Sequence, residues 1–85
     1  SRKIKTSKLN DDLLDIISKN PPPSSKGKFV KIKFCNQLPG YYPQFVFYCN
    51  LPKYVKDPYK RFIENKIRNL YDFEGVPITI YFRKK

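Results

Sequence analysis

The sequence has no histidine, no tryptophan and no methionine, and only two cysteines, Cys35 and Cys49. Histidine and cysteine supply most protein ligands for zinc and similar metals, so we expect no dedicated metal site. Residue alternation along two predicted strands places the two cysteine side chains on opposite faces of a sheet. A disulfide between them would require a β-bulge, and we therefore expect free thiols in a reducing compartment.

Carboxylates are also scarce, with seven Asp and Glu against 18 Lys and Arg, which gives a formal net charge of +11. The carboxylates are scattered and no base stands beside a nucleophile, so we expect no catalytic site in these residues. The charge favours a polyanionic partner, RNA before an anionic membrane surface. The alternative is that the lysines reflect an AT-rich genome, in which case the positive charge has no function.

No apolar run approaches the roughly 20 residues that a membrane span requires, and no segment resembles a signal peptide. We therefore expect a cytoplasmic protein with no membrane partner. The chain has 85 residues and begins at Ser1 rather than at methionine, which favours one domain excised from a longer protein, monomeric by itself. Within this single domain, 1–85, we expect residues 1–5 to be a flexible lead-in from an upstream domain and residues 83–85 to be a basic tail.

Two segments have the apolar spacing of amphipathic helices. The main one, PYKRFIENKIRNLY, runs from Pro58 to Tyr71, and Asp57 can cap it. We expect Phe62 in the core beneath this helix. Thr6 or Ser7 can cap an earlier helix, which ends before a run of three prolines because proline cannot continue a helix.

Three segments alternate in the manner of β-strands, at residues 29–37, 44–50 and 76–83. In the first, Val30, Ile32 and Phe34 occupy one side and lysines the other. The order α-β-β-α-β, with one apolar face on each element, predicts an α+β fold. We expect a two-layer α/β sandwich with a three-stranded mixed sheet and both helices on one face; the strand order stays open.

The other face of this sheet carries the best binding candidates, Lys31, Lys33, Tyr48, Tyr81 and Arg83. Cations can bind phosphates, and tyrosines can stack on bases or fill a protein pocket. Three interpretations remain open. The face contacts RNA, or it docks on other domains of the same protein, or it is an ordinary half-exposed sheet.

Two further groups carry weaker signals. A secondary basic ridge on the main helix comprises Lys60, Arg61, Lys66 and Arg68. The solvated side of a helix is its simpler explanation. The loop at residues 38–43 contains Tyr41 and Tyr42, and it is either a stacking tip or a packed turn.

Several motifs together resemble those of a known family. They are PPP…GK after the first helix, FVFYCNLP at the second strand, and YKRFIENKIRNLYDFEGVPITIYFRKK from the main helix to the end. From about Thr6 to Lys85 the sequence is similar to the C-terminal KH-like domain of the bacterial ribosome-assembly GTPases called Der or EngA. The usual KH clamp is a GXXG loop between two helices, whereas this chain has three glycines, none in that spacing.

The resemblance implies a parent protein with two tandem GTP-binding domains that binds GTP and Mg²⁺ and acts in maturation of the large ribosomal subunit. Its implied partners are the ribosomal large subunit with its rRNA, and the GTP-binding domains of the same chain. These residues contain no G-x-x-x-x-G-K-[ST] loop, since Gly27-Lys28 is followed by Phe29, and we expect no cofactor here. A stand-alone small basic RNA-binding or ribosomal protein is the alternative.

Overall fold

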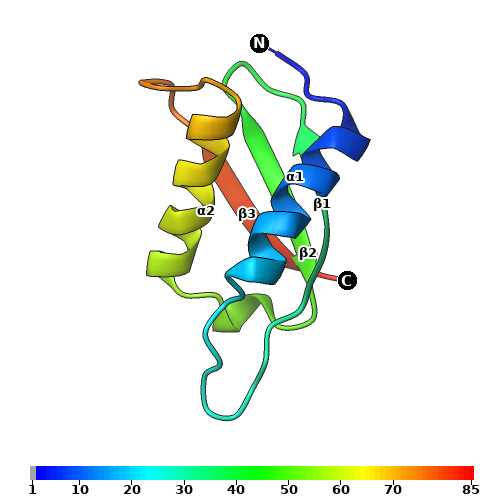
Figure 1. The fold of residues 1–85 in the computed structure, drawn as a ribbon, viewed down its shortest axis with the longest axis vertical. Helices are drawn as coiled ribbons and strands as arrows, with labels where there is room; N and C mark the ends of the chain where they lie inside the picture. The colour runs from blue at the N-terminus through cyan, green and yellow to red at the C-terminus, as the bar shows by residue number, and fades with distance from the viewer. Residues whose placement is uncertain (1) are drawn as a thin grey trace.

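The architecture is a two-layer sandwich, seen in a computed structural model that describes residues 2–85; Ser1, part of the expected lead-in, lies outside the described residues. The elements are α1 (Thr6–Lys19), β1 (Ile32–Leu38), β2 (Gln44–Cys49), the short 3-10 helix η1 (Pro52–Tyr54), α2 (Asp57–Leu70) and β3 (Thr79–Lys84). Both long helices lie on one face of the sheet (Figure 1). The predicted α+β fold, with the order α-β-β-α-β, is confirmed.

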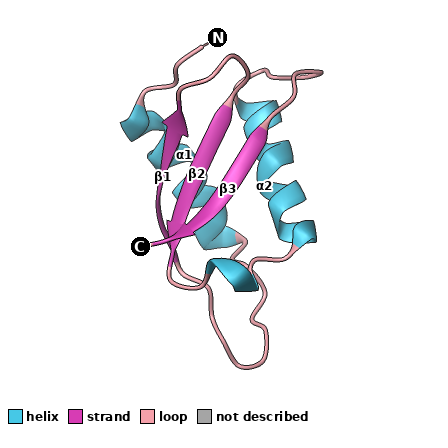
Figure 2. Ribbon diagram, turned by 180° about the vertical axis from the view of Figure 1, so that it is seen from behind, coloured by secondary structure: helices cyan, strands magenta, loops and turns pink. Residues whose placement is uncertain are grey.

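The sheet has the strand order β1-β2-β3, which the sequence left open. β1 and β2 pair antiparallel, β2 and β3 pair parallel, and α2 is part of the connection between the parallel strands. Figure 2 shows the sheet from the side that the helices leave uncovered. We call this side the open face.

Helix α2 buries the stripe that its spacing predicts, with Tyr59, Ile63 and Ile67 facing the sheet. Asp57 is the first helical residue rather than the cap, and its charge there suits the positive end of the helix dipole. Phe62 is only partly buried, because it lies at the margin of the stripe with its ring 5.6 Å from that of Tyr59. The prediction of a core position for Phe62 is therefore wrong.

Helix α1 packs through Leu9, Leu13 and Ile17. It begins at Thr6 after Lys5, and no side chain caps it, so the predicted cap at Thr6 or Ser7 is wrong. The helix ends where the prolines begin, as predicted.

A β-bulge in β1 changes which side chains face the core. Ile32 pairs with Cys49, but Phe34 pairs with Tyr48, so Lys33 is an extra residue in the ladder. Beyond the bulge the alternation is inverted. Cys35 is fully buried and Phe34 is 38% exposed on the open face, which reverses the prediction for both residues.

The core draws on all the main elements and on the connecting segments. Its buried members are Leu9, Leu13, Ile17, Val30, Cys35, Phe45, Phe47, Cys49, Val55, Tyr59, Ile63, Ile67, Tyr71, Phe73 and Ile78. Across residues 2–85 every buried side-chain nitrogen or oxygen has a hydrogen-bond partner. The 85-residue chain therefore closes a core of its own. In this same range, no helix combines the length and the apolar character needed to cross a membrane.

Candidate nucleic-acid interface

The open face is built in rows by the register of the strands. One row joins Phe34, Tyr48 and Arg83 across the three strands, and the next row contains Val46 and Tyr81. Val46 is only 1% exposed although it lies outside the main core, so its larger neighbours cover it. The face is therefore an ordered layer of aromatic and basic side chains.

Aromatic rings and cations are paired on this face. The rings of Phe34 and Tyr48 are stacked with centroids 6.3 Å apart. The Lys85 ammonium lies 5.5 Å from the Tyr48 ring centre, and the Arg83 guanidinium lies 5.5 Å from that of Tyr81. Such pairs hold each cation over an apolar surface while its charge stays available to a phosphate.

The predicted site residues are only partly brought together. Tyr48, Tyr81 and Arg83 share the open face, as the alternation of β2 and β3 required. Lys33, in the bulge, reaches the same end of the sheet, where its ammonium donates a 3.5 Å hydrogen bond to the Lys85 carbonyl. Lys31 precedes β1, and its main chain is hydrogen-bonded to Asn50 rather than being part of the rows described above, so its role on this face stays a prediction.

Two members of this face were not predicted to lie on it. Phe34 was assigned to the core, and the bulge that turns it outward leaves no mark in the alternation of residues 29–37. Lys85 was expected in a tail, but its backbone N–H donates a 3.1 Å hydrogen bond to the Cys49 carbonyl, which extends the ladder. The signal available in the sequence was that Lys85 lies two residues after Arg83, and residues two apart in a strand share a face.

Among the described residues 2–85, no Asp or Glu side chain belongs to the open face. The seven acidic residues are Asp11, Asp12 and Asp15 in α1, Asp57 and Glu64 in α2, and Asp72 and Glu74 in the turn before β3. Within residues 2–85 all three ion pairs join side chains four residues apart on a helix. The cations of the open face are therefore not neutralised by an ion pair of this kind, and they favour an external anion.

The secondary basic ridge on α2 is divided between structural and solvated residues. The Arg68 guanidinium donates to Glu64 at 3.4 Å and to the Val76 carbonyl at 3.3 Å, which ties the helix to the turn before β3. Lys66 lies 5.6 Å from the Phe62 ring centre. Arg61 is exposed. Since α2 lies on the covered side of the sheet, the ridge and the open face are separate surfaces (Figure 2).

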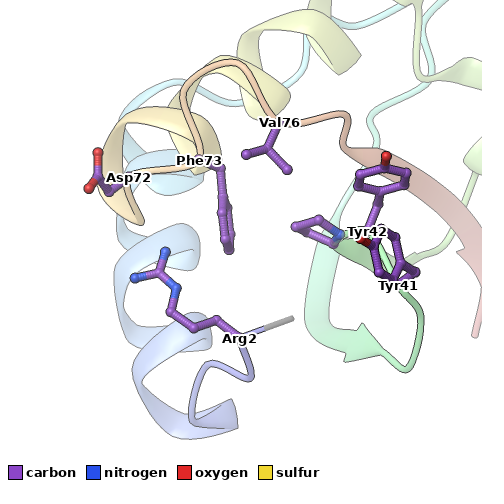
Figure 3. Close-up of a pocket in the computed structure, with 7 residues that line it drawn as sticks. Arg2, Tyr41, Tyr42, Asp72, Phe73 and Val76 are labelled. Carbon is purple, nitrogen blue, oxygen red and sulfur yellow. The ribbon is translucent and has the colours of Figure 1, made fainter.

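An open cleft of about 570 Å³ lies at the end of the sheet where β1 turns into β2. Phe73 and Val76 point into it from one side and the Tyr41–Tyr42 loop closes the other, with Arg2 below (Figure 3). The Arg2 guanidinium lies 4.7 Å from the Phe73 ring centre and donates a hydrogen bond to the Tyr71 carbonyl. Tyr41 is 84% exposed, so this loop is not a packed turn.

The cysteine thiols are not part of a reactive site. Burial raises the pKa of the Cys35 thiol to about 12 and also raises that of Cys49. Both are free and buried. Among residues 2–85 no three His, Cys, Asp or Glu side chains gather as metal ligands would.

The sequence matches a model described as the KH-domain-like region of EngA bacterial GTPase enzymes, C-terminal, over residues 3–83. The chain belongs to this family. It is 67% identical over its whole length to a GTPase Der of Christiangramia forsetii, covering 20% of that protein. It is 66% identical over 99% of its length to the GTPase Der of Flavobacterium psychrophilum, and 54% identical over 98% to that of Bacteroides fragilis, covering 19% of each. The chain thus spans about a fifth of the relatives it matches, and the resemblance seen in the sequence is confirmed.

Proposed function

We propose that this chain is the C-terminal domain of a cytoplasmic GTPase of the Der family, and that its open face contacts rRNA during maturation of the large ribosomal subunit. The observation that carries this proposal is the segregation of charge. Aromatic rings and cations share the open face, while every Asp and Glu lies on the helices or in the turn before β3. Phosphates meet the cations, and the exposed edges of the rings are free to stack.

GTP and Mg²⁺ would be bound by the remainder of such a protein rather than by this chain. The residues do not fit a phosphate loop: Gly27 lies in a tight turn that is closed by the bridge between Ser25 and Lys28, not in the first turn of a helix. The contribution of this domain would be to bind the ribosome and to report its binding to the GTP-binding domains.

The test is RNA binding by the chain as a function of salt concentration. Lys33→Gln, Arg83→Gln and Lys85→Gln together remove three cations from the open face. With about −0.7 per phosphate contact on single strands, the slope of log affinity against log salt should become shallower by roughly two units. The matched control removes three cations from α2, as Lys60→Gln, Arg61→Gln and Lys66→Gln, and should leave the slope nearly unchanged. Equal losses in both triple variants would contradict a specific role for the open face.

Docking of the open face on GTP-binding domains of the same protein is the second candidate. Phe34 at 38% and Tyr81 at 37% exposure favour it, since exposed aromatics inside a charged rim are typical of protein interfaces. Phe34→Ser with Tyr81→Ser distinguishes the two. Under docking, this variant in the full-length protein loses nucleotide-dependent ribosome association while RNA binding by the 85-residue chain is retained.

A further inference from the structure

A second basic surface lies away from the open face, in the connection between α1 and β1. This connection projects beyond both layers at the end of the molecule opposite the N-terminus (Figure 1). Its outer part, residues 25–31, is here called the basic finger. It includes Lys26, Lys28 and Lys31, all of which are exposed.

The tip of the basic finger is a closed turn. Ser25 and Lys28 exchange two backbone hydrogen bonds, of 3.0 and 2.8 Å. The two residues between them, Lys26 and Gly27, have φ of 53° and 72°, as in the two-residue type I′ turn. Glycine, asparagine and aspartate suit both positions, whereas lysine adopts positive φ at a cost. A lysine held in this conformation at a projecting tip points to a use for its charge.

The stem of the finger is fixed by one side chain. Asn50 donates from Nδ2 to the Phe29 carbonyl at 3.0 Å, and its Oδ1 accepts the Lys31 N–H at 2.7 Å. Val30, between these two anchors, is buried. The backbone that carries Phe29 is therefore held in place, and the Phe29 side chain is directed outward with 74% of its surface exposed.

The electrostatic setting of the finger is strongly positive. From residue 16 to residue 56 the chain contains no Asp or Glu but seven lysines. No acidic residue therefore lies near the finger lysines in the sequence. A rigid projection with two tip lysines and one outward aromatic ring offers phosphate binding and base stacking at adjacent positions.

We propose that the basic finger is a second RNA-binding element, in which Lys26 and Lys28 bind phosphates and Phe29 stacks on an unpaired base. The proposal rests on RNA as the partner of the proposed function, but it concerns a different surface. It adds a contact that reaches past the edge of the sheet, so that one RNA strand could meet both surfaces.

The first experiment measures binding of the 85-residue chain to a single-stranded oligouridylate at several salt concentrations. Lys26→Asn with Lys28→Gln removes both tip charges, and asparagine tolerates the left-handed conformation at position 26. We expect the salt slope to become shallower by roughly 1.4, two contacts at about 0.7 each. The control, Lys3→Gln with Lys5→Gln, removes the same charge from the lead-in at the opposite end and should leave the slope unchanged.

The second experiment concerns the ring. Phe29→Ala should weaken oligouridylate binding about tenfold, because stacking on an aromatic side chain contributes on that scale. Phe29→Tyr preserves a stacking ring and should bind as the unmodified chain does. Since Phe29 is exposed, the melting temperature should stay the same in both variants, which separates lost stacking from lost folding.

The outcomes distinguish the two proposals. If the unmodified chain does not bind RNA, both are overturned. If the open-face triple variant loses binding while the finger variants do not, the finger proposal fails and the proposed function stands. The finger variants could also retain RNA binding but weaken association with the GTP-binding portion of the full-length protein. That result would overturn the RNA-binding role of the finger and indicate a protein contact instead. Equal effects of the tip and lead-in variants would overturn a specific role for the finger.

Discussion

The side-chain amide of Asn10 forms two hydrogen bonds with the main chain of Cys35, donating to its carbonyl and accepting its N–H, each at 2.9 Å. Cys35 lies on the outer strand β1, whose free edge would otherwise leave both groups without a partner. One asparagine on α1 therefore substitutes for a fourth strand at this point. It also ties the helix to the strand segment that follows the bulge.

We expect Asn10→Ala to destabilise the protein by about 2–3 kcal/mol, because it leaves an N–H and a C=O unpaired beside a fully buried residue. In a domain of this size that loss lowers the melting temperature by roughly 10–20 °C. Asn69→Ala, at an exposed position of α2, is the control and should change the melting temperature little. Thermal unfolding followed by circular dichroism measures both, and equal melting temperatures would show that the Asn10 bonds contribute nothing.

A hydrogen bond between Asp12 and Tyr71 makes stability depend on acid. The Tyr71 hydroxyl donates to Asp12 Oδ2 at 2.9 Å, and the Lys8 ammonium donates to the same oxygen at 3.1 Å. Burial by itself would raise the pKa of Asp12, but these two donors outweigh it and the pKa is lowered. The folded state therefore binds fewer protons than the unfolded state near about pH 4, so this contribution is present above that pH and is lost as the pH falls.

We expect Tyr71→Phe to lower stability at neutral pH by about 1.5–3 kcal/mol, the usual contribution of a hydrogen bond to a charged group. The variant should also lose part of the acid sensitivity, so that its stability approaches that of the unmodified chain as the pH falls from about 5 to about 2. Urea unfolding at a series of pH values measures this. Asp15→Asn, which removes an exposed pair with Lys19, should produce a much smaller change.

Much of the fold follows from local spacing in the sequence. The recurrence of Tyr59, Ile63 and Ile67 predicts α2 and its buried side, and regular alternation in β2 and β3 places Tyr48, Tyr81 and Arg83 on one face. These predictions succeed because each element obeys its own period without interruption. The same reasoning gives the two-layer arrangement, since every apolar stripe needs a partner.

The bulge in β1 could not be predicted from the spacing of residues in the sequence. Alternation shows only which residues share a side, and one extra residue at Lys33 exchanges the sides for everything beyond it. The main chain of Cys35 is held by Asn10, which is 25 residues away, and no local sequence pattern predicts that contact. Phe34 was therefore missed on the open face.

The two thiols provide a test of this corrected register. Because burial raises the pKa of Cys35 to about 12, and raises that of Cys49 too, almost no thiolate exists in the folded protein. We expect negligible labelling of either cysteine by a thiol-specific disulfide reagent at mildly alkaline pH. Both should react once the chain is unfolded in urea, and Ser24→Cys, at an exposed position, should react at once in the folded protein. Rapid labelling of Cys35 in the folded protein would mean that it lies on the open face, contrary to the corrected register.

Adjacent residues on α2 test the packing of the helix on the sheet. Ile63 is fully buried, whereas Phe62 lies at the margin, where its ring contacts Tyr59 and Lys66. We expect Ile63→Ala to cost about 3–4 kcal/mol, from lost burial and the cavity left behind. Phe62→Ala should cost only about 1–2 kcal/mol although it removes a larger side chain, because that ring is only partly buried. Urea unfolding of both variants gives the order directly. A larger loss for Phe62→Ala would mean that the helix is rotated about its axis toward the orientation in which Phe62, not Ile63, faces β2.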